Sequence, residues 1–225
     1  GFIDFRTVYL TALVMALYTA IYIKQAWLAK YNLLFYALSL FLTNIYWLLP
    51  FYSSQSSFGT YILDRNLFGN PFWRIDYAAS LFYPFWTMGK IYWFTNQPIN
   101  PINWMLPILS LIGLVLLVYK RRVKLSIFLG ILGVVGVILT KQSDYPFPHL
   151  YKWLFNNFLG FVAFREASKF YYFTIISYSI LIGYYLDFIK KSKTVYIKKL
   201  TYFFSLIAIL ALSLINLFPY LSGRI

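Results

Sequence analysis

The sequence lacks cysteine altogether and has a single histidine, His149. Without cysteine, the protein cannot use thiol catalysis, disulfide bonds, iron–sulfur clusters or zinc sites with thiolate ligands. One histidine also excludes a metal site built from several histidines. We find no Walker A loop, no metalloprotease helix motif and no Asn-x-Ser/Thr acceptor. The sequence therefore predicts no metal site and assigns no cofactor, although it leaves a divalent cation open.

Charged residues are also scarce. Charged residues make up 12% of the 225 residues, whereas 61% are hydrophobic and 23% aromatic, and the mean hydropathy is +0.66. A soluble domain is about 25% charged, so this chain has too little polar surface to coat a water-soluble core. The 20 Lys+Arg outnumber the 6 Asp+Glu, but they lie in short clusters between apolar runs. That distribution is typical of topology signals and lipid-phosphate contacts and disfavours nucleic acid.

The sequence contains several long apolar runs. A membrane helix needs about 20 mostly apolar residues, and six stretches come close to this requirement. We therefore predict an all-α polytopic membrane protein with a single transmembrane domain over residues 1–225. The predicted spans are residues 7–28, 33–51, 103–119, 123–140, 170–188 and 200–218.

The connections between these spans alternate in character. Residues 24–30, 120–124 and 190–199 form short loops that carry eleven Lys or Arg. The positive-inside rule places them in the cytoplasm. The predicted membrane is the cytoplasmic (plasma) membrane. Its outer side then carries the long loops 53–102 and 141–169, both chain ends and most of the acidic residues.

Both long outer loops contain segments that we expect to be structured. Residues 77–94 are aromatic but interrupted by proline and glycine, which favours a helix lying in the interface or re-entering the membrane. Residues 150–161 form an amphipathic stretch. Loops of this length are usually functional or disordered, and the aromatic content argues against disorder.

Gly130, Gly133 and Gly136 repeat at helical spacing in the fourth predicted span. Small residues at this spacing let two helix backbones approach closely. We predict close helix packing rather than a nucleotide-binding loop, because no strand precedes the glycines.

The densest polar cluster is residues 164–170, at the outer mouth of the fifth predicted span. In a helix, Arg165 and Lys169 are four residues apart and share a face. Two cations beside a helix N-terminus can bind a substrate phosphate, and Glu166 could tune them or act as an acid or base. The alternative is that the cluster only anchors the helix in the interface.

Two further outer residues are candidates for chemistry. Asp144 could bind a sugar hydroxyl or a cation, and His149 could relay a proton. Each has a structural alternative as an interfacial hydrogen-bonding group. The catalytic residue is therefore left unassigned among Asp144, Glu166 and His149, whereas Arg165, Glu166 and Lys169 are the predicted substrate-binding residues.

Three of the remaining acids are expected to form local ion pairs, whereas Asp4 is expected to cap the first predicted span. Asp64 lies beside Arg65, Asp76 near Arg74, and Asp187 near Lys190 and Lys191. The predicted spans hold almost no ionisable residue at mid-depth, which counts against a channel or a secondary transporter. The polar chemistry is instead predicted at the outer interface.

Three segments carry a resemblance to a known family. Residues 44–50 end a span in an aromatic–proline mouth, residues 139–154 lead from one span into an aromatic stretch, and residues 164–170 open the next span. The stretch from about residue 96 to 187 resembles the GT-C superfamily of polytopic glycosyltransferases, in particular arabinofuranosyltransferase-like and related bacterial and archaeal membrane proteins. In such relatives a proline commonly follows the Arg-Glu pair, whereas this chain has Ala167.

The resemblance implies transfer of a sugar from a polyprenyl-phosphate carrier to a glycan acceptor at the outer face, with inversion at the anomeric carbon. It also implies a carboxylate base near the N-terminus of the whole enzyme, to which no residue here can be matched. Because the chain opens at Gly1 without a methionine, we expect a piece of a larger polypeptide. Two alternatives stay open: a non-catalytic membrane module that binds a lipid-linked glycan or an envelope partner, and a lipid transporter or flippase.

Overall fold

The computed structural model describes residues 5–53, 74–81, 99, 101–158, 160–164, 167–191, 202–207 and 209–211. Every regular element in these ranges is helical, which confirms the all-α class. Among the described residues, two helices are long and apolar enough to cross a membrane by length and composition, and three apolar helices are shorter. Six spans therefore stay a prediction. The two long helices are Val123–Thr140 and Ala167–Lys191, and the shorter ones are Arg6–Ile21, Met105–Tyr119 and Tyr202–Ala211.

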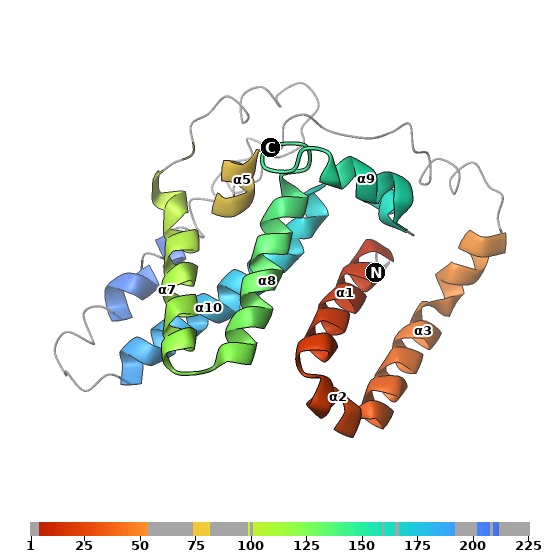
Figure 1. Cartoon of the computed structure of the whole chain (residues 1–225), viewed down its shortest axis with the longest axis horizontal. Coiled ribbons are helices and arrows are strands. Elements are labelled where there is room, and N and C mark those ends of the chain that lie inside the picture. The colour runs from red at the N-terminus through yellow and green to blue at the C-terminus, as the bar shows by residue number, and fades with distance from the viewer. Residues whose placement is uncertain are drawn as a thin grey trace.

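The N-terminal region is a helical hairpin (Figure 1). It consists of α1 (Phe5–Ile21), the short α2 (Ile23–Leu28) and α3 (Lys30–Ser53). The first predicted span is thus divided at Tyr22, whose φ of −106° and ψ of 35° are not helical. α1 packs against α8 and α10, whereas α3 leaves large apolar side chains such as Phe35 exposed.

Three helices form the packed centre of the structure, and the middle one in the chain, α8, runs antiparallel to the other two (Figure 1): α7 (Met105–Tyr119), α8 (Val123–Thr140) and α10 (Tyr171–Lys191). α10 lies along both α7 and α8 (Figure 1). α8 has the same bounds as the fourth predicted span because basic residues stand immediately before and after its apolar run. The 3₁₀ turn η1 (Pro101–Trp104) precedes α7.

Glycines set the distance between these helices. A Cβ atom on Gly136 would lie 2.4 Å from Thr174 Oγ1, and one on Gly133 would lie 2.9 Å from Ser177 Oγ. The predicted close packing is therefore confirmed at these two glycines, which face α10. Gly130 differs, because its Cβ would make only ordinary contact, at 3.8 Å, with Leu114 of α7.

Short elements cover the end of the bundle at which α8 ends and α10 begins. They are α5 (Ile75–Ser80), α9 (Leu150–Asn157), η2 (Phe161–Ala163) and η3 (Ala167–Phe170). We call this end the loop end. α9 occupies most of the predicted amphipathic stretch and buries Tyr151 and Phe155. Of the predicted interfacial segment 77–94, α5 holds the first residues, and 82–94 lie outside the described residues.

An aromatic cluster holds the loop end together. The ring centres of Phe161 and Phe164 lie 5.4 and 4.9 Å from that of Phe170, and the Tyr151 ring meets Phe161 edge-on at 5.2 Å. Tyr151 also donates its hydroxyl hydrogen bond to the Phe164 carbonyl oxygen. Because each of these rings contacts others in the cluster, the aromatic contacts join α9, η2 and η3.

Substituting Gly113 tests the close packing. Its Cβ would lie 2.2 Å from the Leu181 carbonyl oxygen, whereas a Cβ on Gly183 would meet nothing within 4 Å. We expect Gly113→Ala to lower the free energy of unfolding by about 1–3 kcal/mol, the usual cost of overpacking. Gly183→Ala should leave it unchanged or raise it by up to about 1 kcal/mol, because alanine favours helix. Thermal unfolding in detergent measures both, and equal behaviour of the two variants would contradict the packing.

Candidate functional site

Lys169 is the member of the predicted phosphate-binding cluster that the structure describes. It lies half-buried in η3, a 3₁₀ turn that precedes α10, so it does not belong to the α10 helix itself. Phe164 is not helical, with a φ of −98° and a ψ of 53°. Arg165 and Glu166 lie outside the described residues, and the predicted shared face of Arg165 and Lys169 stays a prediction.

Buried hydroxyl groups surround the junction at which Lys169 lies. The side-chain oxygens of Thr140, Ser168 and Thr174 are buried and have no hydrogen-bond partner in the part of the chain that the structure describes. Thr140 ends α8, which packs against η3. A buried hydroxyl without a partner costs about 1–3 kcal/mol, so this junction suits water or the hydroxyls of a polar ligand.

Asp144 lies in the turn after α8 and binds a distant segment. Its Oδ2 accepts a hydrogen bond of 2.8 Å from the backbone N–H of Ile75, the first residue of α5. A carboxylate at a helix N-terminus also interacts favourably with the helix dipole. The Oδ1 atom of Asp144 has no hydrogen-bond partner among the residues described. One oxygen therefore supports the fold, and the other is available to a ligand.

Lys141 is a polar residue of this site that sequence reasoning missed. It follows the last residue of α8, is fully buried, and donates a hydrogen bond from Nζ to the backbone carbonyl of Asp144. Burial lowers the pKa of Lys141, and the negative charge of Asp144 opposes this shift. A lysine after a long apolar run suggests only snorkelling into the interface, so nothing in the sequence signals that this side chain is buried.

α5 is fixed in place by two tyrosines of α10. The Tyr171 hydroxyl donates to the Tyr77 carbonyl and the Tyr178 hydroxyl donates to the Ala79 carbonyl, each at 3.1 Å. Burial also raises the pKa of the Tyr77 hydroxyl. These contacts bring a segment almost a hundred residues earlier in the chain to the mouth of α10.

Two of the predicted ion pairs are confirmed, whereas Asp64 and Arg65 lie outside the described residues. Arg74 and Asp76 meet at 2.7 Å at the start of α5, and the hydrogen bond and charge of Asp76 raise the pKa of Arg74. At the other end of the bundle, Lys191 and Asp187 meet at 2.7 Å. Both pairs are largely exposed, so each contributes little to stability.

His149 stands apart from the other candidates. It precedes α9 and is exposed, and within the described ranges its side chain has no hydrogen-bond or ion-pair partner. No contact joins it to Asp144 or Lys169 in those ranges. The structure thus brings Asp144 together with Lys141 and α5, and does not bring His149 into that group.

Comparison with known proteins gives no assignment, because no family model, no curated protein and no solved structure matches the chain. Among the described residues, no group of three or more His, Asp or Glu side chains could hold a metal ion. The chemistry of the site therefore rests on its own side chains: carboxylate, ammonium and hydroxyl groups at the loop end.

The pH dependence of stability tests the burial of Lys141. Because its pKa is lowered from 10.5 in the folded state, the folded protein binds fewer protons than the unfolded protein between that lowered pKa and pH 10.5. Stability attributable to this group should therefore rise with pH in that window and be constant below it.

As the pH rises from neutral toward 10.5, we expect the melting temperature of wild type to rise relative to that of Lys141→Met. The matched control is Lys152→Met on α9, whose side chain is exposed. This control should run parallel to wild type at every pH. A Lys141→Met profile that also runs parallel would show that the ammonium group is hydrated.

Proposed function

We propose that the chain is an integral protein of the cytoplasmic membrane with six spans, and that it is a glycosyltransferase, or part of one. It would transfer a sugar from a polyprenyl-phosphate donor to a glycan acceptor at the outer face. The observation that supports this proposal is the gathering of Asp144, Lys141, Lys169 and buried hydroxyls at one end of an apolar helical bundle.

The exposed sides of the helices support the membrane part of the proposal. Phe35 on α3 is 72% exposed and Val115 on α7 is 65% exposed, and many other large apolar side chains on these helices are exposed as well. Soluble monomers rarely expose contiguous apolar patches of more than a few hundred Å². Lipid tails would cover these faces without the cost of hydrating them.

In the proposed reaction, the acceptor hydroxyl oxygen attacks the anomeric carbon of the donor while the bond from that carbon to the phosphate oxygen breaks. A carboxylate takes the proton of the hydroxyl, and the carrier leaves as a phosphate. Asp144 has one oxygen available for this role, with Glu166 the other carboxylate near Lys169 in the sequence. Lys169 and Arg165 would stabilise the charge of the departing phosphate.

A non-catalytic module that binds a lipid-linked glycan is the second candidate function. The observation that favours it is that Asp144 and Lys141 already serve the fold, through Ile75 and the turn after α8. In that case the phosphate would bind to the same cations, but no group would act as a base.

Donor binding is the first test of the proposal. In native mass spectrometry from detergent, the wild-type chain should retain a long-chain polyprenyl phosphate. Arg165→Gln/Lys169→Gln should lose it by about tenfold or more, because charge-assisted hydrogen bonds to phosphate contribute about 1.5–3 kcal/mol. Lys152→Gln on α9 is the matched control and should behave as wild type. Equal retention by all three proteins would contradict the site.

Asp144→Asn distinguishes the enzyme from the binding module. The amide keeps an oxygen that can accept the Ile75 hydrogen bond but cannot take a proton. A transferase that uses Asp144 as its base should lose turnover of the bound donor by about 100-fold or more while donor binding stays the same. Full turnover in this variant would remove Asp144 from the catalytic role.

Cysteine labelling tests the six-span topology. The chain has no native cysteine, so single cysteines can be placed without background. An impermeant thiol reagent applied to sealed vesicles should reach Ser143→Cys and Ser192→Cys from opposite sides. Labelling of both from the same side would exclude the proposed arrangement around α10.

A further inference from the structure

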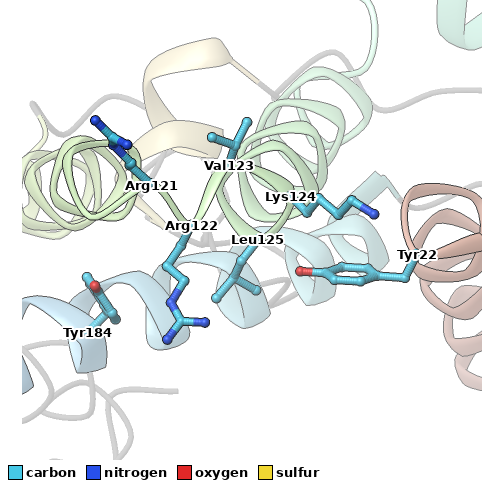
Figure 2. A pocket seen from close by; sticks show the side chains of 7 residues that line it. All are labelled: Tyr22, Arg121, Arg122, Val123, Lys124, Leu125 and Tyr184. Carbon is cyan, nitrogen blue, oxygen red and sulfur yellow. The ribbon is translucent and has the colours of Figure 1, made fainter. Parts of the chain in front are cut away.

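A pocket of about 500 Å³ lies at the end of α8 opposite to the loop end. Three separate parts of the chain line it: Tyr22 at the junction of α1 and α2, residues 121–125 at the turn into α8, and Tyr184 on α10 (Figure 2). It therefore belongs to the packed bundle and not to one surface loop. It is also distant from the candidate site, because α8 separates the two.

The pocket is strongly basic. Arg121, Arg122 and Lys124 line it, and no acidic side chain does. Among the described residues these cations have no ion-pair partner. The nearby acid of α10, Asp187, is engaged by Lys191 at 2.7 Å. No acidic residue in the described part of the chain therefore neutralises the positive charge of the pocket.

The side chains are arranged around a common space. Figure 2 shows Arg122 extending on the side of Tyr184 and Lys124 extending over Tyr22, whereas Arg121 points away from both. The Lys124 Nζ lies 5.8 Å from the centre of the Tyr22 ring. Arg122 with Tyr184 and Lys124 with Tyr22 therefore line two sides of one pocket, where an anionic headgroup can lie between them. The first turn of α8, which has no side-chain cap, adds its backbone N–H groups.

An apolar stripe on α8 begins at this pocket. Val123, Ile127, Ile131 and Val134 are all exposed and recur at helical spacing. Lys124 and Ile131 are seven residues apart and therefore lie on nearly the same face. A ligand with an anionic head and a long apolar tail fits this combination, whereas a small soluble anion would use only the head of the site.

We propose that this pocket binds the phosphate of an anionic phospholipid, whose acyl chain lies along the Val123–Val134 stripe. Arg122 and Lys124 are the main cationic ligands, with Tyr22 and Tyr184 as hydroxyl donors. The inference goes beyond the proposed function, since it requires that the chain lies in a membrane but not that it transfers a sugar. A free phosphate shares the head-group chemistry, and the experiment separates the two sources.

The test measures binding of phosphatidylglycerol and phosphatidylcholine to the full chain by native mass spectrometry from detergent. We expect wild type to retain phosphatidylglycerol preferentially. Arg122→Gln/Lys124→Gln should weaken that binding by about 30-fold, because each basic residue near anionic lipid contributes about fivefold. Should the double variant fail to fold by circular dichroism, the exposed Lys124→Gln alone should weaken binding by about fivefold.

The matched control removes two other cations of the short basic loops. Lys24→Gln/Lys30→Gln changes the net charge equally, on the same predicted side of the membrane, but neither residue lines the pocket. This control should retain phosphatidylglycerol as wild type does. Equal weakening in both double variants would show general attraction to charge, and no weakening in either would show that the pocket is not used. Both results overturn the proposal.

Competition with glycerol 3-phosphate identifies the source of the phosphate. Phosphatidylglycerol should resist displacement by an excess of this soluble headgroup, since the acyl stripe adds apolar contact that the headgroup lacks. Displacement would show that the pocket binds a soluble phosphate and would overturn the proposal of a lipid ligand. The probes and variants differ from those at the loop end, so loss of polyprenyl-phosphate binding there leaves this result unaffected.

Discussion

The close approach of α10 to α7 and α8 is the constraint on which the rest of the described structure depends. Gly113, Gly133 and Gly136 leave no room for a Cβ atom against α10. Within this contact, Ser177 Oγ donates a 2.8 Å hydrogen bond to the Leu129 carbonyl, which links α10 to α8 directly. In lipid there is no hydrophobic force between helices, so backbone contact and such hydrogen bonds have to hold a bundle together. The position of α10 then decides where the residues at both ends of the bundle lie.

At the loop end, the position of α10 allows its side chains to hold α5 in place. Tyr171 and Tyr178 donate hydrogen bonds to α5, and Asp144 binds the first N–H of the same helix from the turn after α8. Two contacts from α10 and one from the turn after α8 thus hold a six-residue helix that could not form alone. The available oxygen of Asp144 is fixed in position because its other oxygen has this structural role. A group that is held in one orientation by the fold is well suited to meet a substrate.

The sequence allowed prediction of those parts of the fold that depend on local composition. The bounds of α8 could be predicted because Arg122 and Lys141 enclose a run that is apolar except for Lys124, Ser126 and Thr140, and the glycine spacing predicted its close packing. The break at Tyr22 could not be predicted, since no proline or glycine marks it. The contact between Asp144 and Ile75 joins residues 69 apart and depends on how α10 places α5. Local patterns carry no information about such long-range contacts, and they likewise cannot show that Lys141 is buried.

The two ends of α8 carry the same sign of charge, although the helix dipole treats them differently. Lys141 follows the C-terminus, where the partial negative charge of the helix favours a cation. Arg122 and Lys124 flank the N-terminus, where the partial positive charge disfavours them by about 0.3–1 kcal/mol each. In the proposed topology, the positive-inside rule would explain why cations lie on this side of the membrane, but not why they line a pocket that also contains two tyrosines. An anion in that pocket would offset both the dipole and the mutual repulsion of the cations, so membrane orientation and lipid binding would follow from the same residues.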